Sequence, residues 1–208
     1  LFSDLSSLTL SGLFDISQTD NSKWYGEISL KESIGKNDSM AMALTPMGKR
    51  MEMVMPYAMQ TGDDSSSLIF GLANLRELGE GILLGNQMKR KIVISEADWS
   101  LGDATELSSW IQYSLSKSIS ISSRLKFVET NSLSGKNSLI MAPVQTANPD
   151  NYGGKELYLG LGMNVSLNFL PGGKDTIGIE ILKPLDQDKN NLQMKTDYQI
   201  IVGYQKSL

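Results

Sequence analysis

The sequence contains no cysteine and no histidine among its 208 residues. Without cysteine, the chain has no disulfide framework and no thiolate chemistry. Without histidine, it lacks the commonest general base and the commonest zinc ligand, which excludes catalysis by a Ser-His-Asp triad. No run of about 18 apolar residues occurs, so no transmembrane helix is expected. The net charge of −4 argues against nucleic acid as a partner.

The sequence does contain a strict alternation of apolar and polar residues, which is clearest over residues 155–169. Apolar residues occupy every second position from Leu157 to Phe169, and most positions between them hold glycine, asparagine or serine. Period-2 alternation predicts a β-strand with two unlike faces. Strands in soluble domains usually have about 5–6 residues, whereas a tilted strand that crosses a bilayer needs about 9–11. The length of this segment therefore favours a transmembrane β-barrel with a polar interior.

Nine segments have the composition of strands, and most carry one apolar face. They are residues 6–17, 22–33, 64–77, 80–95, 103–116, 118–130, 154–170, 174–185 and 194–208. The fourth is the weakest, because Lys89, Arg90 and Lys91 interrupt its pattern. No segment predicts a helix, because serine, glycine and β-branched residues dominate the periodic regions.

The expected connections alternate in length, as they do in outer-membrane barrels. Short turns are predicted near residues 19–21, 79–81, 116–118 and 171–174, and longer links over 35–63, 96–102, 131–153 and 186–192. The alternative is a soluble β-sandwich, whose apolar stripes would have to face one another in a core.

The chain ends in DYQIIVGYQKSL, with Tyr198, Ile200, Val202, Tyr204 and Leu208 in one alternating register. Many outer-membrane barrels end in such a strand. We therefore predict an all-β fold, an antiparallel transmembrane β-barrel of about 9–12 strands with long external loops and short periplasmic turns. Residues 1–208 would form one such domain in the bacterial outer membrane.

The number of predicted strands is odd. Counting strands back from the C-terminus places Leu1 on the external side of the membrane. We therefore expect either a further strand before residue 1 or a strand that the pattern does not reveal, for which residues 40–59 are the best candidate.

Much of the chain resembles a known family. The resemblance is carried by MEMVMPYAMQTGDDSSSLIFGL, WSLGDATELSSWIQY, APVQTANPDNYGGKELYLGLGMNV and IGIEILKPLDQDKNNLQMKTDYQIIVGYQ. These stretches resemble outer-membrane barrels of the phenol-degradation meta-pathway transporter type, in a Met-rich branch often mislabelled alpha-amylase. One departure is that the family usually has a Gly-Ser-Gly run where this chain has Gly62, Asp63 and Asp64. The resemblance implies an outer-membrane barrel with a transport role and supplies no catalytic residues.

The predicted inward positions carry several charged side chains. The residues expected to line the lumen are Asp15, Glu27, Lys31, Glu106, Arg124, Lys126, Asn164 and Glu180. In a narrow barrel, opposite charges can pair across the lumen and close it, whereas in a wider barrel they line a path and select permeants. A barrel of about ten strands leaves little free bore, which favours pairing. Nothing in the sequence fixes two carboxylates at the separation that glycoside hydrolysis requires, so we expect no enzymatic activity.

Methionine is concentrated in one stretch, where seven of the eleven residues lie between Met40 and Met59. Met51, Met53 and Met55 alternate, so an extended chain would place three thioethers on one face. Thioethers are soft ligands that suit Cu(I), although Lys49 and Arg50 would repel a cation. The alternative is that these methionines pack a loop into or over the barrel mouth.

A second metal motif is weaker. The spacing of Asp186, Asp188 and Asn190 is similar to that of a calcium loop, but Asn191 occupies the position that requires glycine. We interpret this segment as a polar external loop.

The leading functional prediction is passage or binding of a small solute by a barrel embedded in outer-membrane lipid. One alternative is a structural or interaction barrel with a closed lumen that presents 35–63 and 131–153 to partners. Another is a copper-binding barrel that uses the Met-rich stretch. No other cofactor is expected, and the sequence does not fix the oligomeric state.

Overall fold

The computed structural model describes residues 5–45, 47–140, 144–167 and 174–207. Within these residues the chain forms β-strands and short 3₁₀ turns, and no α-helix. None of the described helical turns is long and apolar enough to cross a membrane. The long strands are β1 (Ser7–Gln18), β2 (Ser22–Ser33), β5 (Ser65–Gly79), β6 (Ile82–Glu96), β8 (Ala104–Ser114), β9 (Ile119–Thr130), β11 (Gly154–Leu167), β12 (Lys174–Lys189) and β13 (Gln199–Ser207).

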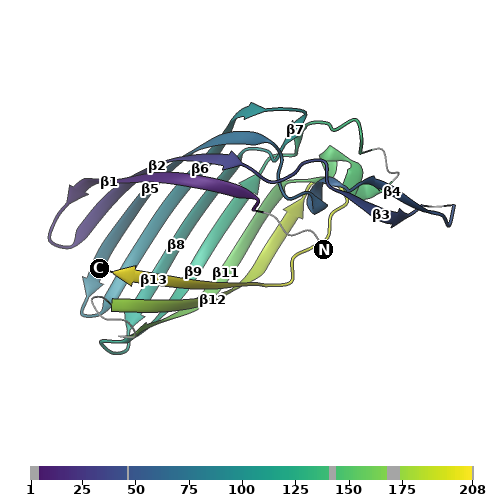
Figure 1. The fold of residues 1–208 in the computed structure, drawn as a ribbon. Coiled ribbons are helices and arrows are strands. Elements are labelled where there is room, and N and C mark those ends of the chain that lie inside the picture. The colour runs from purple at the N-terminus through teal and green to yellow at the C-terminus, as the bar shows by residue number, and fades with distance from the viewer. Residues whose placement is uncertain (1–4, 46, 141–143, 168–173, 208) are drawn as a thin grey trace.

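The long strands form one nine-stranded antiparallel sheet in the order β1-β2-β5-β6-β8-β9-β11-β12-β13. The sheet curls into a half-barrel (Figure 1). In the described structure β1 and β13 are its two edges and are not paired with each other. Each long strand pairs with the next long strand along the chain, so all the longer links gather at one end of the sheet, here called the long-link end. The tight turns lie at the opposite, short-turn end.

Each of the nine segments predicted from the sequence overlaps one long strand, so the all-β antiparallel prediction is confirmed at this level. The last segment was predicted to begin at residue 194, but β13 begins at Gln199. The predictions made for Leu1, Phe169, residues 171–173 and Leu208 lie outside the described residues. The apparently weak fourth segment is a full strand, β6. Its three consecutive cations alternate between the two faces of the sheet and do not interrupt it.

The prediction of a polar loop beginning at Asp186 is wrong. β12 continues to Lys189, and Asp186 and Asp188 pair with Leu157 and Lys155 of β11. Gln187 stabilises this extension, because its side-chain amide both donates to and accepts from the backbone of Thr196.

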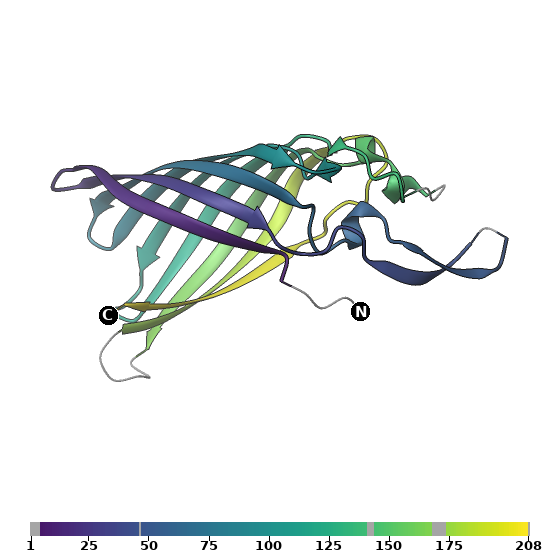
Figure 2. The ribbon, with the colours of Figure 1, turned by 45° about the horizontal axis from the view of Figure 1, so that its top comes forward.

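The Met-rich stretch forms a short hairpin of β3 (Met40–Leu44) and β4 (Arg50–Val54), which is a separate two-stranded sheet. A missed strand of the large sheet does not lie there. The hairpin extends away from the large sheet at the long-link end (Figure 2). Smaller elements of the links are β7 (Trp99–Ser100), β10 (Ser134–Gly135) and the 3₁₀ turns η1 (Tyr57–Met59), η2 (Gln145–Ala147) and η3 (Pro149–Asn151).

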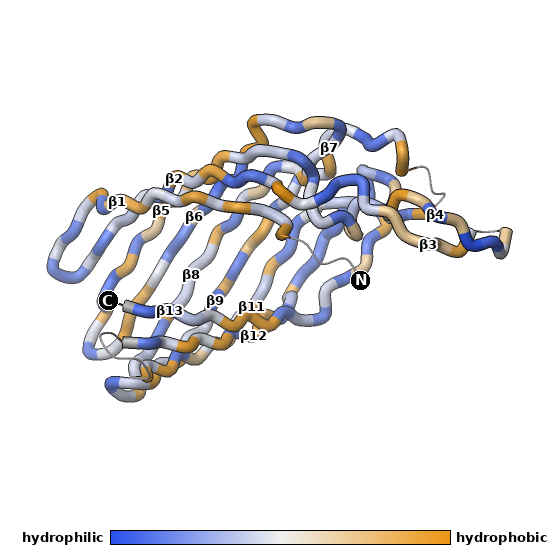
Figure 3. Tube along the Cα trace, in the orientation of Figure 1, coloured by the Kyte–Doolittle hydropathy of each residue, from blue (hydrophilic) through white to orange (hydrophobic). Residues whose placement is uncertain are grey.

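Side-chain alternation gives the large sheet two unlike faces, visible as the changing hydropathy along each strand (Figure 3). On one face, apolar residues of neighbouring strands lie in register, as Leu161 of β11 does with Ile181 of β12 and Ile200 of β13. These side chains are exposed, Leu161 by 64%. No second sheet covers them in the described part of the chain, which argues against the β-sandwich alternative.

The opposite, polar face is the concave one. Glu27 on β2 and Lys89 on β6 form an ion pair across β5, so their side chains converge above the strand between them. Gly71 of β5 lies in register between these residues, and a Cβ atom there would meet the Glu27 Cβ at 2.9 Å. Glycine on this face therefore leaves room for longer side chains from the neighbouring strands.

A small apolar cluster ties the links together at the long-link end. Tyr57, on η1, packs edge-on against Trp99 with ring centroids 4.8 Å apart, and against Tyr152 at 5.9 Å. The remaining members of the cluster are Val54, Leu133, Ile140 and Ala147. Because these residues come from three different links, their packing orders this end of the molecule.

Candidate functional site on the concave face

The register of the sheet places all the residues predicted to line a lumen on the concave face. Glu27, Gly71, Lys89 and Glu106 follow one another across four strands. The other predicted residues share this face by alternation along their strands and by cross-strand pairing; they are Asp15, Lys31, Arg124, Lys126, Asn164 and Glu180.

Three of the predicted carboxylates form ion pairs. The pairs are Glu27 with Lys89 at 2.8 Å, Glu106 with Lys126 at 2.9 Å, and Glu180 with Arg124 at 2.7 Å. Each pair joins strands that are neighbours or are separated by one strand. The sequence analysis expected pairing across the lumen. The charges instead pair along one wall, and such pairs do not obstruct the space in front of the sheet.

Arg124 is held from two sides. Its Nε donates to the Glu180 carboxylate, and its guanidinium lies 5.0 Å from the ring centroid of Trp110 on β8. Gly160 and Gly162 of β11 lie in register with Arg124 and Glu180, respectively, so the ion pair passes over a glycine-lined strand. Stacking on an aromatic ring and ion pairing together fix the guanidinium in one orientation.

The other predicted residues have fewer partners. Asn164 donates a long hydrogen bond of 3.5 Å to the Ser120 hydroxyl. Asp15 and Lys31 form no ion pair with any described residue. The structure thus brings Glu27, Glu106, Arg124, Lys126 and Glu180 into local pairs and leaves Asp15 and Lys31 apart from them.

Sequence analysis missed two lysines of this face, Lys89 and Lys91. Arg90, between them, lies on the convex face and pairs there with Asp103 at 3.1 Å. A strict period-2 interpretation of the Lys-Arg-Lys run would have found both inward lysines. The inward pair of Lys189 with Glu156, at 3.1 Å, was missed because β12 was predicted to end too early.

Asp63 anchors the links beside the concave face. Its carboxylate accepts the Leu101 N–H at 2.7 Å and the Ser65 hydroxyl at 2.8 Å. Burial disfavours the charged carboxylate. Hydrogen bonds from Leu101, Ser65 and Ser33 and the charge of Lys91 outweigh burial, so the pKa of Asp63 is lowered from its ordinary value. This carboxylate joins the link before β5 to the link after β6.

The methionines of the hairpin occupy unlike surroundings. Met51 and Met53 lie on one face of β4, opposite Ala43 and Ala41 of β3. Met51 is exposed and Met53 half-buried, while Met55 follows the strand and is buried. The predicted alternation therefore places two thioethers beside small partners. Burial of Met55 agrees with the packing interpretation for that residue. No described group of three or more histidine, cysteine, aspartate or glutamate residues could hold a metal ion.

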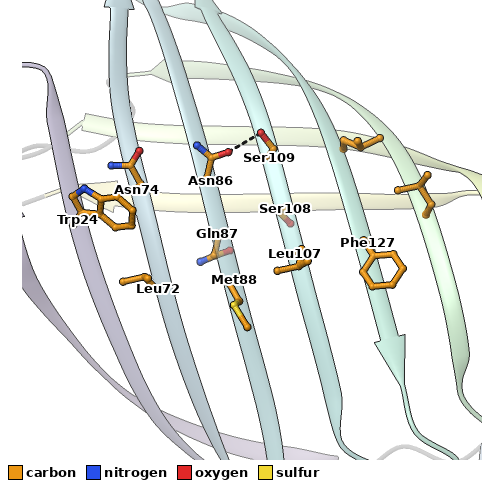
Figure 4. Close-up of a pocket in the computed structure, with 12 residues that line it drawn as sticks. Trp24, Leu72, Asn74, Asn86, Gln87, Met88, Leu107, Ser108, Ser109 and Phe127 are labelled. Carbon is orange, nitrogen blue, oxygen red and sulfur yellow. Dashed lines mark hydrogen bonds between the residues drawn. The ribbon is translucent and has the colours of Figure 1, made fainter.

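A shallow groove of about 500 Å³ crosses the convex face (Figure 4). Its floor is a row of small polar side chains in register, Asn74, Asn86 and Ser109. Ser109 donates to the Asn86 side-chain oxygen at 2.9 Å, and Asn74 donates to Ser22 at 2.8 Å. Leu72, Met88, Leu107 and Phe127 rise beside the row. The groove faces away from the charged residues, so it is not part of the concave site.

No protein-family model matches the chain, and no curated protein sequence matches it either. The geometry of the two faces is therefore the basis for inferring a function.

Proposed function

We propose that this protein is a β-barrel of the bacterial outer membrane that passes or binds a small polar solute along its concave face. The observation that carries the proposal is the contrast between the faces, one charged and internally paired, the other apolar and exposed. Lipid on the convex side would solvate that apolar surface. The shortest long strand, β13, has 9 residues, which reaches the length needed by a tilted strand.

The arrangement of the ion pairs supports a path in preference to a closed lumen. Each pair satisfies charges on the same wall, so the concave face can remain polar without side chains bridging the bore. Charged rings and walls of this kind select permeants.

A barrel in a bilayer also requires that both edges of the sheet be paired. Unpaired N–H and C=O groups along β1 and β13 would have no partner in hydrocarbon. The proposal therefore includes closure of the sheet through these two edges in the membrane.

Conductance in planar lipid bilayers tests the proposal. The protein folded into detergent should insert and produce discrete current steps, and unboiled samples should migrate faster on SDS gels than boiled ones. A monodisperse monomer in detergent-free buffer would contradict membrane insertion. Insertion without conductance would favour the structural barrel, for which the apolar cluster around Tyr57 and Trp99 supplies an ordered surface.

From the resemblance alone, we propose that this protein belongs to the meta-pathway transporter type of outer-membrane barrel. Its support is that the resembling stretches fall largely on long strands of the sheet, since they include parts of β5, β8, β11, β12 and β13. The departure at Gly62–Asp64 falls where Asp63 anchors two links, so this chain uses that position for a contact of its own.

Cu(I) binding by the hairpin is a second proposal, which a different observation favours. Met51 and Met53 share one face of the hairpin with Ala43 and Ala41, whose small side chains leave room beside the two thioethers. Titration under reducing conditions should show saturable Cu(I) binding that is lost when Met51, Met53 and Met55 are replaced by leucine. Met40→Leu/Met42→Leu, on the other face of the hairpin, is the matched control and should retain binding. Unchanged affinity in the triple variant would leave only the packing role.

A further inference from the structure

Positive charge is in excess on the concave face near the long-link end. The carboxylates Glu27, Glu106, Glu156 and Glu180 each have a cation within 3.1 Å. Within the described part of the chain, Lys31 has neither an ion pair nor a side-chain hydrogen bond. Among the described residues, Lys91 has no carboxylate at ion-pair distance, and its ammonium donates only to the Leu101 carbonyl, at 3.0 Å. Two cations of this face are therefore left without carboxylate partners.

These two lysines lie on either side of one strand. Lys31 of β2 is in register with Ser67 of β5, and Lys91 of β6 is in register with Ile69, two residues further along β5. Neighbouring strands are about 4.8 Å apart, so both side chains rise from the concave surface around the same stretch of β5. Both groups are cationic and lie on the same face on either side of β5, so their charges repel each other. An anion between the two ammonium groups would relieve that repulsion and accept a hydrogen bond from each.

Two carboxylates act on Lys91, those of Asp63 and Asp103, and neither neutralises this pair of lysines. Asp103 is already paired with Arg90. Both oxygens of Asp63 already accept hydrogen bonds, from the Ser65 hydroxyl and the Leu101 N–H. Leu101 also accepts from Lys91, so one residue of the link holds both the carboxylate and the ammonium in place. Even with the charge of Asp63 included, the group of Lys31, Lys91 and Asp63 remains positive.

The short-turn end of the same face has no such excess. Lys23 lies there and forms no ion pair with a described residue, and Asp15, for which the same is true, shares that end of the face. The charges of Lys23 and Asp15 therefore cancel at the short-turn end, whereas Lys31 and Lys91 leave the long-link end positive.

We propose that Lys31 and Lys91 form a binding site for anionic solutes, of the carboxylate or phosphate class, on the concave face at the long-link end. This inference rests on the proposed function and names the class of solute that the path prefers. Lysine side chains that line a pore select anions by the same electrostatics. The site lies on the concave face beside the links, so a solute that enters from the long-link end would meet it early along the path.

Reversal potentials in planar bilayers under a KCl gradient test the inference with the full chain. The unmodified protein should show a preference for chloride over potassium. Lys31→Glu/Lys91→Glu should reverse the sign of the potential, and Lys31→Arg/Lys91→Arg should keep it. The matched control is Lys136→Glu/Lys195→Glu, which makes the same change in net charge at exposed positions of two links and should leave the preference for chloride in place.

The outcomes separate the two claims. Conductance with no anion preference, or equal shifts in the site and control variants, would overturn the anion site and leave the proposed path standing. Failure of every variant and of the unmodified protein to conduct would overturn both. Inorganic phosphate added on the long-link side should reduce chloride current through the unmodified protein. The same reduction in the double glutamate variant would also count against the site.

Discussion

The two faces of the nine-stranded sheet are built from the same strands, one residue apart, yet they differ in almost every property. The convex face presents large apolar side chains that remain exposed, Val202 by 68%. The concave face carries glycine, serine and charged side chains joined in ion pairs, and Ser29 there is only 1% exposed. Along each strand, alternate residues therefore have different roles: one set forms the apolar surface, and the other set forms the polar, charged surface. A substitution should therefore have effects that depend on which face it changes.

Each face also carries some side chains of the opposite character. On the convex face, Arg90 is paired with Asp103, and the asparagines of the groove are bonded to neighbours. The concave face also has apolar side chains, among them Trp110, which packs against Arg124. Two others, Leu13 and Ile201, lie on the edge strands, where both side chains are exposed.

The largest effect is expected from a charge on the convex face. Leu161→Arg should destabilise the protein folded into lipid vesicles by about 2–4 kcal/mol, because it places an ion in hydrocarbon near mid-membrane. Asn164→Ala, three residues along the same strand but on the concave face, should cost much less. Urea unfolding in vesicles measures both free energies. An equal loss of unfolding free energy in the two variants would mean that both faces are in contact with the same solvent.

The concave ion pairs should be worth more than a pair on the convex face. A double-mutant cycle with Arg124→Gln and Glu180→Gln should give a coupling free energy of about 1–3 kcal/mol, because both groups are largely shielded from water. The control cycle on Lys155 and Glu129, a more exposed pair at 3.3 Å, should give less than about 1 kcal/mol. Similar coupling free energies in the two cycles would show that ion pairs on the concave face are not stronger than those on the convex face.

Asp63 makes the long-link end sensitive to acid. The pKa of Asp63 is lowered in the folded state, so its contribution to stability is complete above the ordinary value of 3.8 and is lost as the pH falls through the folded pKa. Limited proteolysis by pepsin should therefore cleave the links near Leu101 more readily as the pH falls below about 3.8. Asp63→Asn should lose much of this pH dependence, since its side chain does not titrate. An unchanged pH profile in that variant would assign the acid response to another group.

The smallest effect is expected in the groove. Asn86→Leu removes one hydrogen bond with Ser109 and adds an apolar group to a face that we propose is in contact with lipid. The two changes oppose each other, so the unfolding free energy in vesicles should shift by less than about 1 kcal/mol. Asn74→Leu should cost more, because Asn74 donates to both Ser22 and the Lys23 carbonyl. The reverse order would show that the polar row is not held together as described.

The sheet was largely predictable because its signal is local. Alternation over β11 and the apolar stripes of its neighbours identify the strands and the face of each predicted lumen residue without any knowledge of contacts. The apolar cluster was not predictable, because Tyr57, Trp99 and Leu133 come from different links and share no periodicity. The end of β12 was missed for a similar reason, since the bonds between Gln187 and Thr196 that extend it are tertiary. Both members were predicted to face inward only for the pairs of Glu106 with Lys126 and of Glu180 with Arg124. Which charges meet could not be predicted, because the curl of the sheet decides it.

The most direct test of the central claim is a spin-label accessibility scan along β11. Single cysteines at residues 157–165, labelled with a nitroxide in the protein folded into vesicles, report collisions with oxygen, which is enriched in lipid, and with a water-soluble nickel chelate. We expect period-2 alternation, with labels at Leu159, Leu161 and Met163 accessible to oxygen and labels at Gly160, Gly162 and Asn164 accessible to nickel. Accessibility to nickel at every position, or the opposite phase, would contradict a lipid-facing convex surface and a polar path on the concave side.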